Sequence, residues 1–209
     1  GYASIIYSGL YPVITLYGGY GGRAVYLIDE SKDEDRDVYM TWNEVIGSGG
    51  LSFPLNFSRG IYSTLLDFGA ETGYIKIYNK SREDYKLYNY MRKDGDLSYI
   101  KYFLSFSNLS QRALNSVTPG IGEVLTLTYF HTPYHGDYRG SLFSSVLDLH
   151  LPGFTDTQGA KISGSYERIK YENYIFTQQF LFPRGYDSER QDELYKGTVH
   201  YAFPIVNVS

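Results

Sequence analysis

The sequence predicts an all-β fold, an antiparallel transmembrane β-barrel to which this chain contributes roughly eight to ten strands. Two observations lead to this fold class. Apolar and polar residues alternate with a period of two in many segments, as they do in a strand with one apolar face. Aromatic residues make up 18% of the 209 residues, including 24 tyrosines and 12 phenylalanines. Transmembrane barrels place such residues in girdles at both membrane interfaces.

Composition excludes several other classes of protein. The formal net charge is -4 and the isoelectric point is near 5.6, without a cluster of Lys and Arg, so we expect no nucleic-acid partner. The chain has no cysteine, which removes disulfides and thiolate metal sites. No apolar run is long enough for a transmembrane helix. The mean hydropathy of -0.32 is typical of strands that alternate lipid-facing and water-facing residues.

The N-terminal half reads as strands separated by polar and glycine-rich stretches. Residues 2–20 are rich in β-forming residues, and residues 9–12 either turn the chain or bend it. The densest charge run, residues 29–37, predicts a solvated loop rather than a Ca²⁺ site, because it lacks the glycine and the ligand spacing of a calcium loop. In residues 38–55 the glycine cluster at 47–50 predicts a bulge or strong curvature.

Four alternating segments place charged residues opposite an apolar face. They are residues 62–72, 100–107, 139–151 and 196–205. Charged side chains on the second face of such strands suit a water-filled lumen. The predicted lumen-lining residues are Asp67, Glu71, Lys101, Asp148, His150, Lys196 and His200.

The connections between these segments differ in length. Short turns are expected near Pro54, Pro119 and Pro152. Longer polar loops are expected at 29–37, 79–96 and 182–195, and a long β segment that starts at Ala160 is expected to run, with a kink near Asn173, toward the last of these loops. Short turns at one rim and long loops at the other are typical of outer-membrane barrels.

Residues that could carry chemistry are few. His131 and His135 are four apart, but Pro133 prevents the helix that would bring them together, so a turn is favoured over a metal site. Asp148 and His150 share one face of a strand and could bind a metal or exchange protons, but lining a lumen explains them without a further assumption. No catalytic or phosphate-binding motif is present. We therefore expect no enzyme, no cofactor and no metal.

The segment that organises the chain is residues 182–186, Phe-Pro-Arg-Gly-Tyr, followed by the strand at 196–205. An Arg-Gly-aromatic loop before a strand that ends in an aromatic-Pro-aliphatic sequence resembles the BamA/TamA-like outer-membrane assembly superfamily, also called the bacterial surface antigen family. Arg184, Gly185 and Tyr186 match the loop motif of that family, whereas Pro183 stands where the family usually has valine. The turn signal at 118–122, Thr-Pro-Gly-Ile-Gly, is a further point of similarity, because a Pro-x-Gly turn commonly leads into a barrel strand in that family.

The resemblance implies a sixteen-stranded barrel in the bacterial outer membrane, with one loop folded into the lumen. It implies that Arg184 holds that loop in place by pairing with acidic or aromatic residues, since an unpaired guanidinium inside a barrel is costly. It also implies that residues 1–209 form one barrel domain that is incomplete at the C-terminus and at the N-terminus. The expected partners are the lipid bilayer, lipopolysaccharide and other outer-membrane proteins, either as clients or as subunits of a complex.

Three functions remain open on the sequence. The first is a barrel that assists insertion and assembly of outer-membrane proteins, or protein translocation, as the resemblance implies. The second is a passive outer-membrane pore or surface-attachment barrel. The third is a secreted soluble β-protein that binds polysaccharide through its aromatic residues, which long alternating strands disfavour.

Overall fold

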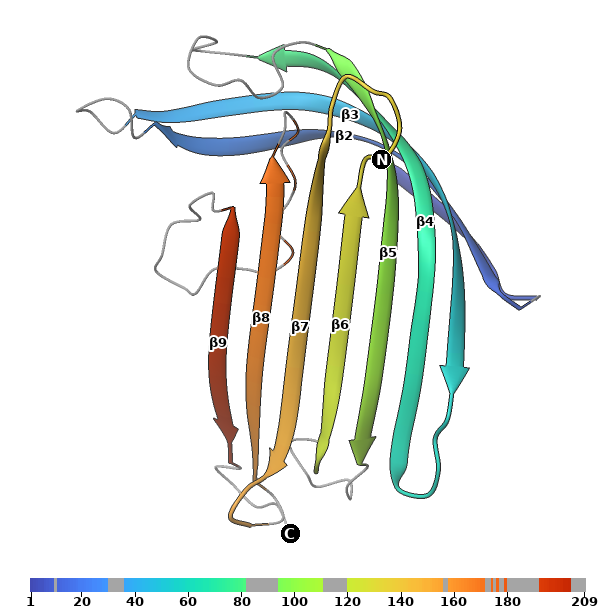
Figure 1. Ribbon diagram of the computed structural model, residues 1–209, viewed down its shortest axis with the longest axis vertical. Coiled ribbons are helices and arrows are strands. Elements are labelled where there is room, and N and C mark those ends of the chain that lie inside the picture. Colours follow the sequence, from blue (N-terminus) through green and yellow to red (C-terminus); the bar gives the residue numbers. More distant parts are fainter. Residues whose placement is uncertain are drawn as a thin grey trace.

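The described residues of the protein form a single antiparallel sheet of nine strands in the order β1 to β9, so each strand pairs with its neighbours in sequence (Figure 1). This computed structural model describes residues 1–209 except 10, 30–35, 82–93, 111–119, 156–157, 172–173, 175, 177–178, 180–191 and 204–209. The described residues confirm the all-β class, and the sheet that they form is not closed, because β1 and β9 each pair on one side only. None of them forms a helix long and apolar enough to cross a membrane.

The strands are long in the first half of the chain and shorter in the second. Their bounds are β1 Tyr2–Tyr7, β2 Val13–Asp29, β3 Arg36–Asn56, β4 Tyr62–Ser81, β5 Gly95–Ser110, β6 Gly122–His131, β7 Gly140–Pro152, β8 Gly159–Tyr171 and β9 Glu193–Ala202. The structure resolves the point left open at residues 9–12, because the chain breaks into two strands there. The long β segment expected to start at Ala160 is β8, which ends at Tyr171, so the expected continuation toward residue 182 is not part of this strand. The kink expected near Asn173 lies outside the described residues.

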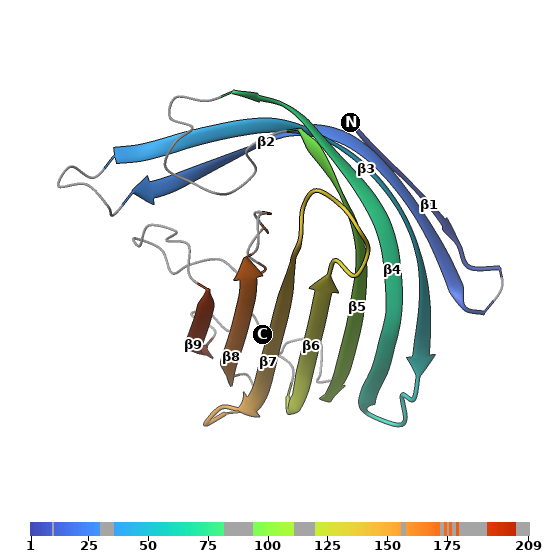
Figure 2. The same ribbon diagram turned by 45° about the horizontal axis from the view of Figure 1, so that its top comes forward.

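The pairing register assigns every strand residue to one of two faces. Thr15, Gly50, Glu71, Lys101 and Phe130 lie side by side on consecutive strands, and neighbouring positions along each strand alternate between the faces. The sheet is curved (Figure 2). This face is the concave one, and across it Tyr174, which follows β8, forms hydrogen bonds with Arg23 of β2 and Glu44 of β3. The opposite face is convex. It carries apolar residues in the middle of the strands, as the alternation predicts.

The strongest bending occurs in β2 and β3, whose far ends extend past the other strands (Figures 1 and 2). The glycines at 47–50 lie in β3 without interrupting it, and Gly47 pairs with Gly18 of β2. The register shift between β3 and β4 lies at Thr41/Asn43, so the predicted bulge is displaced from the glycine cluster. Glycine removes side-chain crowding and thereby permits a tighter curve.

The strand order places alternate connections at opposite ends of the sheet. Residues 8–12, 57–61, 111–121 and 153–158 connect strands at one end, which we call the turn end. Residues 30–35, 82–94, 132–139 and 172–192 connect strands at the other end, which we call the loop end. The expected short turns near Pro54 and Pro152 correspond to connections at the turn end, and Pro119 lies outside the described residues. The expected loops at 29–37, 79–96 and 182–195 overlap connections at the loop end, but several of their residues belong to strands and most of the others lie outside the described residues.

The buried hydrophobic residues in the described part of the chain gather at the loop end of the concave face. They are Trp42, Ile75, Ile77, Leu97, Tyr99, Tyr138, Leu142, Ile169, Tyr174 and Phe176. Seven of them come from strands, whereas Tyr138, Tyr174 and Phe176 come from connections that fold onto the sheet. Aromatic rings make much of this packing: Tyr99 stacks on Phe130 with ring centroids 4.5 Å apart, and Phe176 meets Phe130 edge-on at 5.2 Å.

We predict that Gly73→Ala destabilises the sheet. Gly73 pairs directly with Tyr99, and a Cβ atom at position 73 would lie 2.6 Å from the Tyr99 ring, which is itself 5% exposed and cannot move freely. Overpacking of this kind costs roughly 1–3 kcal/mol. The measurement is the free energy of unfolding by urea titration of the refolded protein.

The matched control is Gly47→Ala on the neighbouring strand, where a Cβ atom would meet nothing within 4 Å. We expect this variant to unfold at the same urea concentration as the wild type or slightly above it, because alanine reduces the freedom of the unfolded chain. Equal stability of the two variants would contradict the close packing of Tyr99 over Gly73.

Candidate functional site on the concave face

The register places all seven predicted lumen-lining residues on the concave face. Glu71 lies opposite Lys101 on β5, and Asp67 lies on the same side of β4. On the other half of the sheet, His150, Lys161 and His200 lie side by side on β7, β8 and β9. Asp148 and Lys196 follow on the same face by the two-residue alternation. The strand pattern therefore brings these residues to one surface, in two groups separated by β6.

The first group is built around Glu71 of β4. Tyr99 donates its hydroxyl to Glu71 Oε1 at 2.6 Å, and Lys101 Nζ donates to Glu71 Oε2 at 2.9 Å. Both carboxylate oxygens therefore have a partner. Beside this group lies a hollow of about 500 Å³ whose lining includes Tyr17, Ser48, Asp67, Glu71, Lys101 and Phe103. The lining of this hollow combines charged residues with the apolar residues Leu51 and Phe103.

The second group lies on β7 to β9. Lys161 Nζ contacts Asp148 Oδ2 at 2.7 Å, and the two side chains remain 37% and 20% exposed. Such partly exposed pairs add little stability, typically below about 1 kcal/mol. His150 Nδ1 has no hydrogen-bond partner among the described residues. Groups of three or more His, Asp or Glu that could hold a metal are absent from the described part of the chain.

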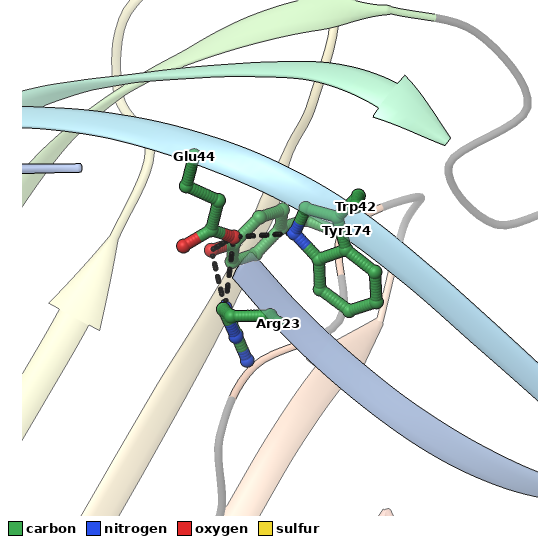
Figure 3. Close-up of polar contacts among 4 residues, drawn as sticks. All are labelled: Arg23, Trp42, Glu44 and Tyr174. Carbon is green, nitrogen blue, oxygen red and sulfur yellow. Dashed lines mark hydrogen bonds and ion pairs between the residues drawn. The ribbon is translucent and has the colours of Figure 1, made fainter. Parts of the chain in front are cut away.

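At the loop end the concave face carries a buried polar cluster, which we call the interior cluster: Arg23, Trp42, Glu44 and Tyr174 (Figure 3). Glu44 Oε1 accepts from Trp42 Nε1 at 2.7 Å, from Arg23 Nη1 at 3.0 Å and from the Tyr174 hydroxyl at 3.3 Å. Arg23 Nη1 also donates to the Tyr174 hydroxyl at 3.0 Å. The guanidinium of Arg23 lies 5.1 Å from the Trp42 ring centroid.

Burial makes this cluster costly to disrupt. Trp42 is 1% exposed, Glu44 3% and Tyr174 3%. A carboxylate at that depth is tolerated only when it is paired and hydrogen-bonded. Burial raises the pKa of Tyr174 above its ordinary value, so its hydroxyl keeps its proton and remains a donor to Glu44. Through Tyr174, the cluster thus holds the segment that follows β8 against β2 and β3, at the opposite edge of the sheet.

A second buried carboxylate holds the same segment to β8. Glu167 is 1% exposed, and its Oε2 accepts from the backbone N–H of Gln179 at 2.7 Å. Its Oε1 has no hydrogen-bond partner among the described residues. Together with the rings of Phe176 and Tyr174, which meet edge-on at 5.1 Å, this hydrogen bond keeps Tyr174, Phe176 and Gln179 against the concave face.

Sequence reasoning missed the residues of this closed end. Glu44 and Tyr174 are 130 positions apart, and neither belongs to a recognisable motif. The available signal was Glu44 itself, an acidic residue two positions from the only tryptophan of the sequence and on the same face of the strand. The predicted loop motif, Arg184, Gly185 and Tyr186, lies outside the described residues. His131 and His135 are both described, and His131 lies on the convex face, stacked on Tyr129.

Comparisons of this chain with protein-family models, with curated proteins and with solved structures found no match.

We predict that Tyr174→Phe loosens the segment after β8. The variant keeps the ring but removes a donor to Glu44 and an acceptor for Arg23, and each net hydrogen bond of this kind is worth about 1 kcal/mol. Glu44→Ala should cost more, about 3 kcal/mol, because three donors lose their acceptor. Limited proteolysis of the refolded protein should show faster cleavage within residues 172–192.

Tyr129→Phe is the matched control, since Tyr129 lies on the convex face and is 42% exposed. It should leave both proteolysis and unfolding unchanged. If Tyr174→Phe behaves like this control, the interior cluster does not hold the segment.

Proposed function

We propose that this chain is the membrane-embedded wall of an outer-membrane β-barrel that assists insertion and assembly of other outer-membrane proteins, or protein translocation. The observation that carries the membrane part of the proposal is the contrast between the two faces of one sheet. The convex face exposes a band of apolar side chains, and the concave face holds charged pairs and a covered end.

The convex band is aliphatic at its centre. Its members include Leu147, Leu149 and Leu151 of β7, Ile162 of β8 and Val199 of β9, which are between 38% and 74% exposed. A soluble protein of this size rarely leaves such a contiguous apolar surface in water. On β7 the band runs from Phe143 to Leu151, close to the length of roughly nine to eleven residues that a tilted strand needs to cross a bilayer.

Aromatic rings bound the band toward both ends of the sheet. Toward the loop end the row consists of Tyr102, Tyr129, Phe143, Tyr166 and Tyr195. Tyr166 and Tyr195 are cross-strand partners with ring centroids 4.8 Å apart. Toward the turn end, Tyr201 packs against Phe154 and Phe203. Two aromatic borders around an aliphatic centre are the arrangement of barrels in a bilayer.

The covered concave end supports assembly or translocation over a passive pore. A pore that conducts steadily needs a wetted path along its wall, whereas here Trp42, Ile77, Leu97 and Ile169 are at most 2% exposed beneath the segment after β8. A barrel closed at rest is compatible with a protein that opens for a client. The assembly role itself rests on the resemblance carried by Arg184, Gly185 and Tyr186.

The first test is the partitioning of the full-length protein between water and detergent, followed by electrophoresis of the folded fraction with and without boiling. We expect the protein to require detergent and to migrate faster unboiled, because a folded barrel resists denaturation by the gel detergent. A protein that stays soluble and monomeric without detergent contradicts the proposal and favours the secreted polysaccharide-binding alternative.

Depletion of the protein from its cell, with a census of the other outer-membrane proteins, then separates the two membrane functions. We expect the amounts of folded client barrels to fall. Unchanged client amounts, together with steady conductance of the purified protein in planar bilayers, would favour a passive pore or surface-attachment barrel.

A further inference from the structure

Hydrogen-bond donors cross the convex face just beyond the aromatic row, on the side of the loop end. His131 of β6 pairs with Ser141 of β7, and Ser141 pairs with Lys170 of β8, so the three lie side by side on one face. Neighbouring strands are about 4.8 Å apart, so an ammonium, a hydroxyl and an imidazole follow one another within about 10 Å. We call these three residues, with Arg168, the rim patch.

The charged side chains of the rim patch are exposed, and the imidazole of His131 is held by aromatic rings. Lys170 is exposed and has no ion pair among the described residues. Arg168 lies two positions earlier on the same face, and its pair with Glu193 at 3.2 Å leaves it 67% exposed. His131 stacks on the rings of Tyr129 and Tyr102, with centroids 5.1 and 5.9 Å away. The aromatic row therefore holds the imidazole at the border of the apolar band.

The distribution of positive charge on the convex face is one-sided. Among the strand side chains that the structure describes, the Lys and Arg residues of this face are Lys76, Arg168 and Lys170. Arg168 lies level with Phe143 of the aromatic row, whereas Lys76 and Lys170 lie on its loop-end side. Lys76 lies opposite Asp96 of β5, whereas Lys170 lies opposite the uncharged Ser141 of β7. Toward the turn end, the convex face of β5 and β6 instead carries Asn108 and Glu123.

We propose that the rim patch binds the phosphate groups of lipopolysaccharide in the leaflet at the loop end. This inference rests on the proposed function, because the patch meets a lipid headgroup only if the convex band lies in a bilayer. The aromatic row then lies at the interface, and the row of donors lies one step further out, at headgroup level. Phosphate accepts several hydrogen bonds at once from Lys, Arg and hydroxyl donors. Long loops face the outside in outer-membrane barrels, which is the lipopolysaccharide side.

The test measures equilibrium binding of fluorescent lipid A to the folded full-length protein in an uncharged detergent. The probes are diphosphoryl lipid A and the same lipid after removal of its phosphates. We expect the wild type to prefer the phosphorylated form and to lose this preference as salt is raised. Lys170→Gln should weaken binding of the phosphorylated form roughly fivefold, the weight of one basic residue at an anionic membrane surface. Adding Arg168→Gln should weaken it further.

Lys196→Gln is the charge-matched control, because Lys196 lies on the concave face of β9, away from lipid. It should bind both lipids as the wild type does, and Lys170→Arg should retain the preference for phosphate. Two results would overturn this inference without affecting the proposed function. The first is equal binding of the two lipids by a protein that migrates as a folded barrel. The second is wild-type affinity in the variant that combines Lys170→Gln with Arg168→Gln. A protein that never forms a detergent-resistant barrel would overturn the proposed function together with this inference.

Discussion

The backbone hydrogen bonds of the sheet are the constraint on which everything else depends. Each inner strand is paired on both sides in an antiparallel order, so the side chains alternate between two faces wherever the register is regular. That geometry converts a period of two in the sequence into two chemically different surfaces. Glu71 and Lys101 meet on one face because their strands pair there, and Leu147 and Ile162 are exposed on the other for the same reason. A slip of one residue in any strand would exchange the faces of that strand.

The curved sheet alone would leave its concave face uncovered, and the interior cluster covers that face at the loop end. A single carboxylate oxygen of Glu44 gathers donors from β2, from β3 and from the segment after β8. Burying such a carboxylate costs free energy unless all its hydrogen-bond partners are present. The closed arrangement is therefore specific, because it depends on particular partners and not only on apolar contact. Glu167 of β8 holds the same segment at a second point, the backbone N–H of Gln179. Closure of the concave face and an apolar convex face together support a membrane barrel that is shut at rest.

Alternation made the strands and the faces of their residues accessible to prediction, because it depends only on neighbours in sequence. Asp67, Asp148 and His200 could therefore be assigned to one surface without a structure. The closed end could not, since Tyr174 reaches Glu44 across 130 residues and the chain leaves β8 at Tyr171 instead of extending it. The bulge at Thr41/Asn43 was also missed, because the glycines at 47–50 draw attention to a stretch that curves without a register shift. Contacts that depend on how far a sheet bends are not encoded in a local pattern.

The central claim is that the convex face contacts lipid and the concave face does not. The absence of cysteine allows single nitroxide labels at introduced cysteines, and the adjacent positions Val146 and Leu147 on β7 point to opposite faces. The most direct measurement is the accessibility of each label to oxygen, which concentrates in lipid, and to a water-soluble nickel chelate, with the full-length protein in vesicles. We predict that the label at 147 is reached mainly by oxygen, and that the ratio of oxygen to nickel-chelate accessibility is much lower for the label at 146. Access of the nickel chelate to both positions would contradict it.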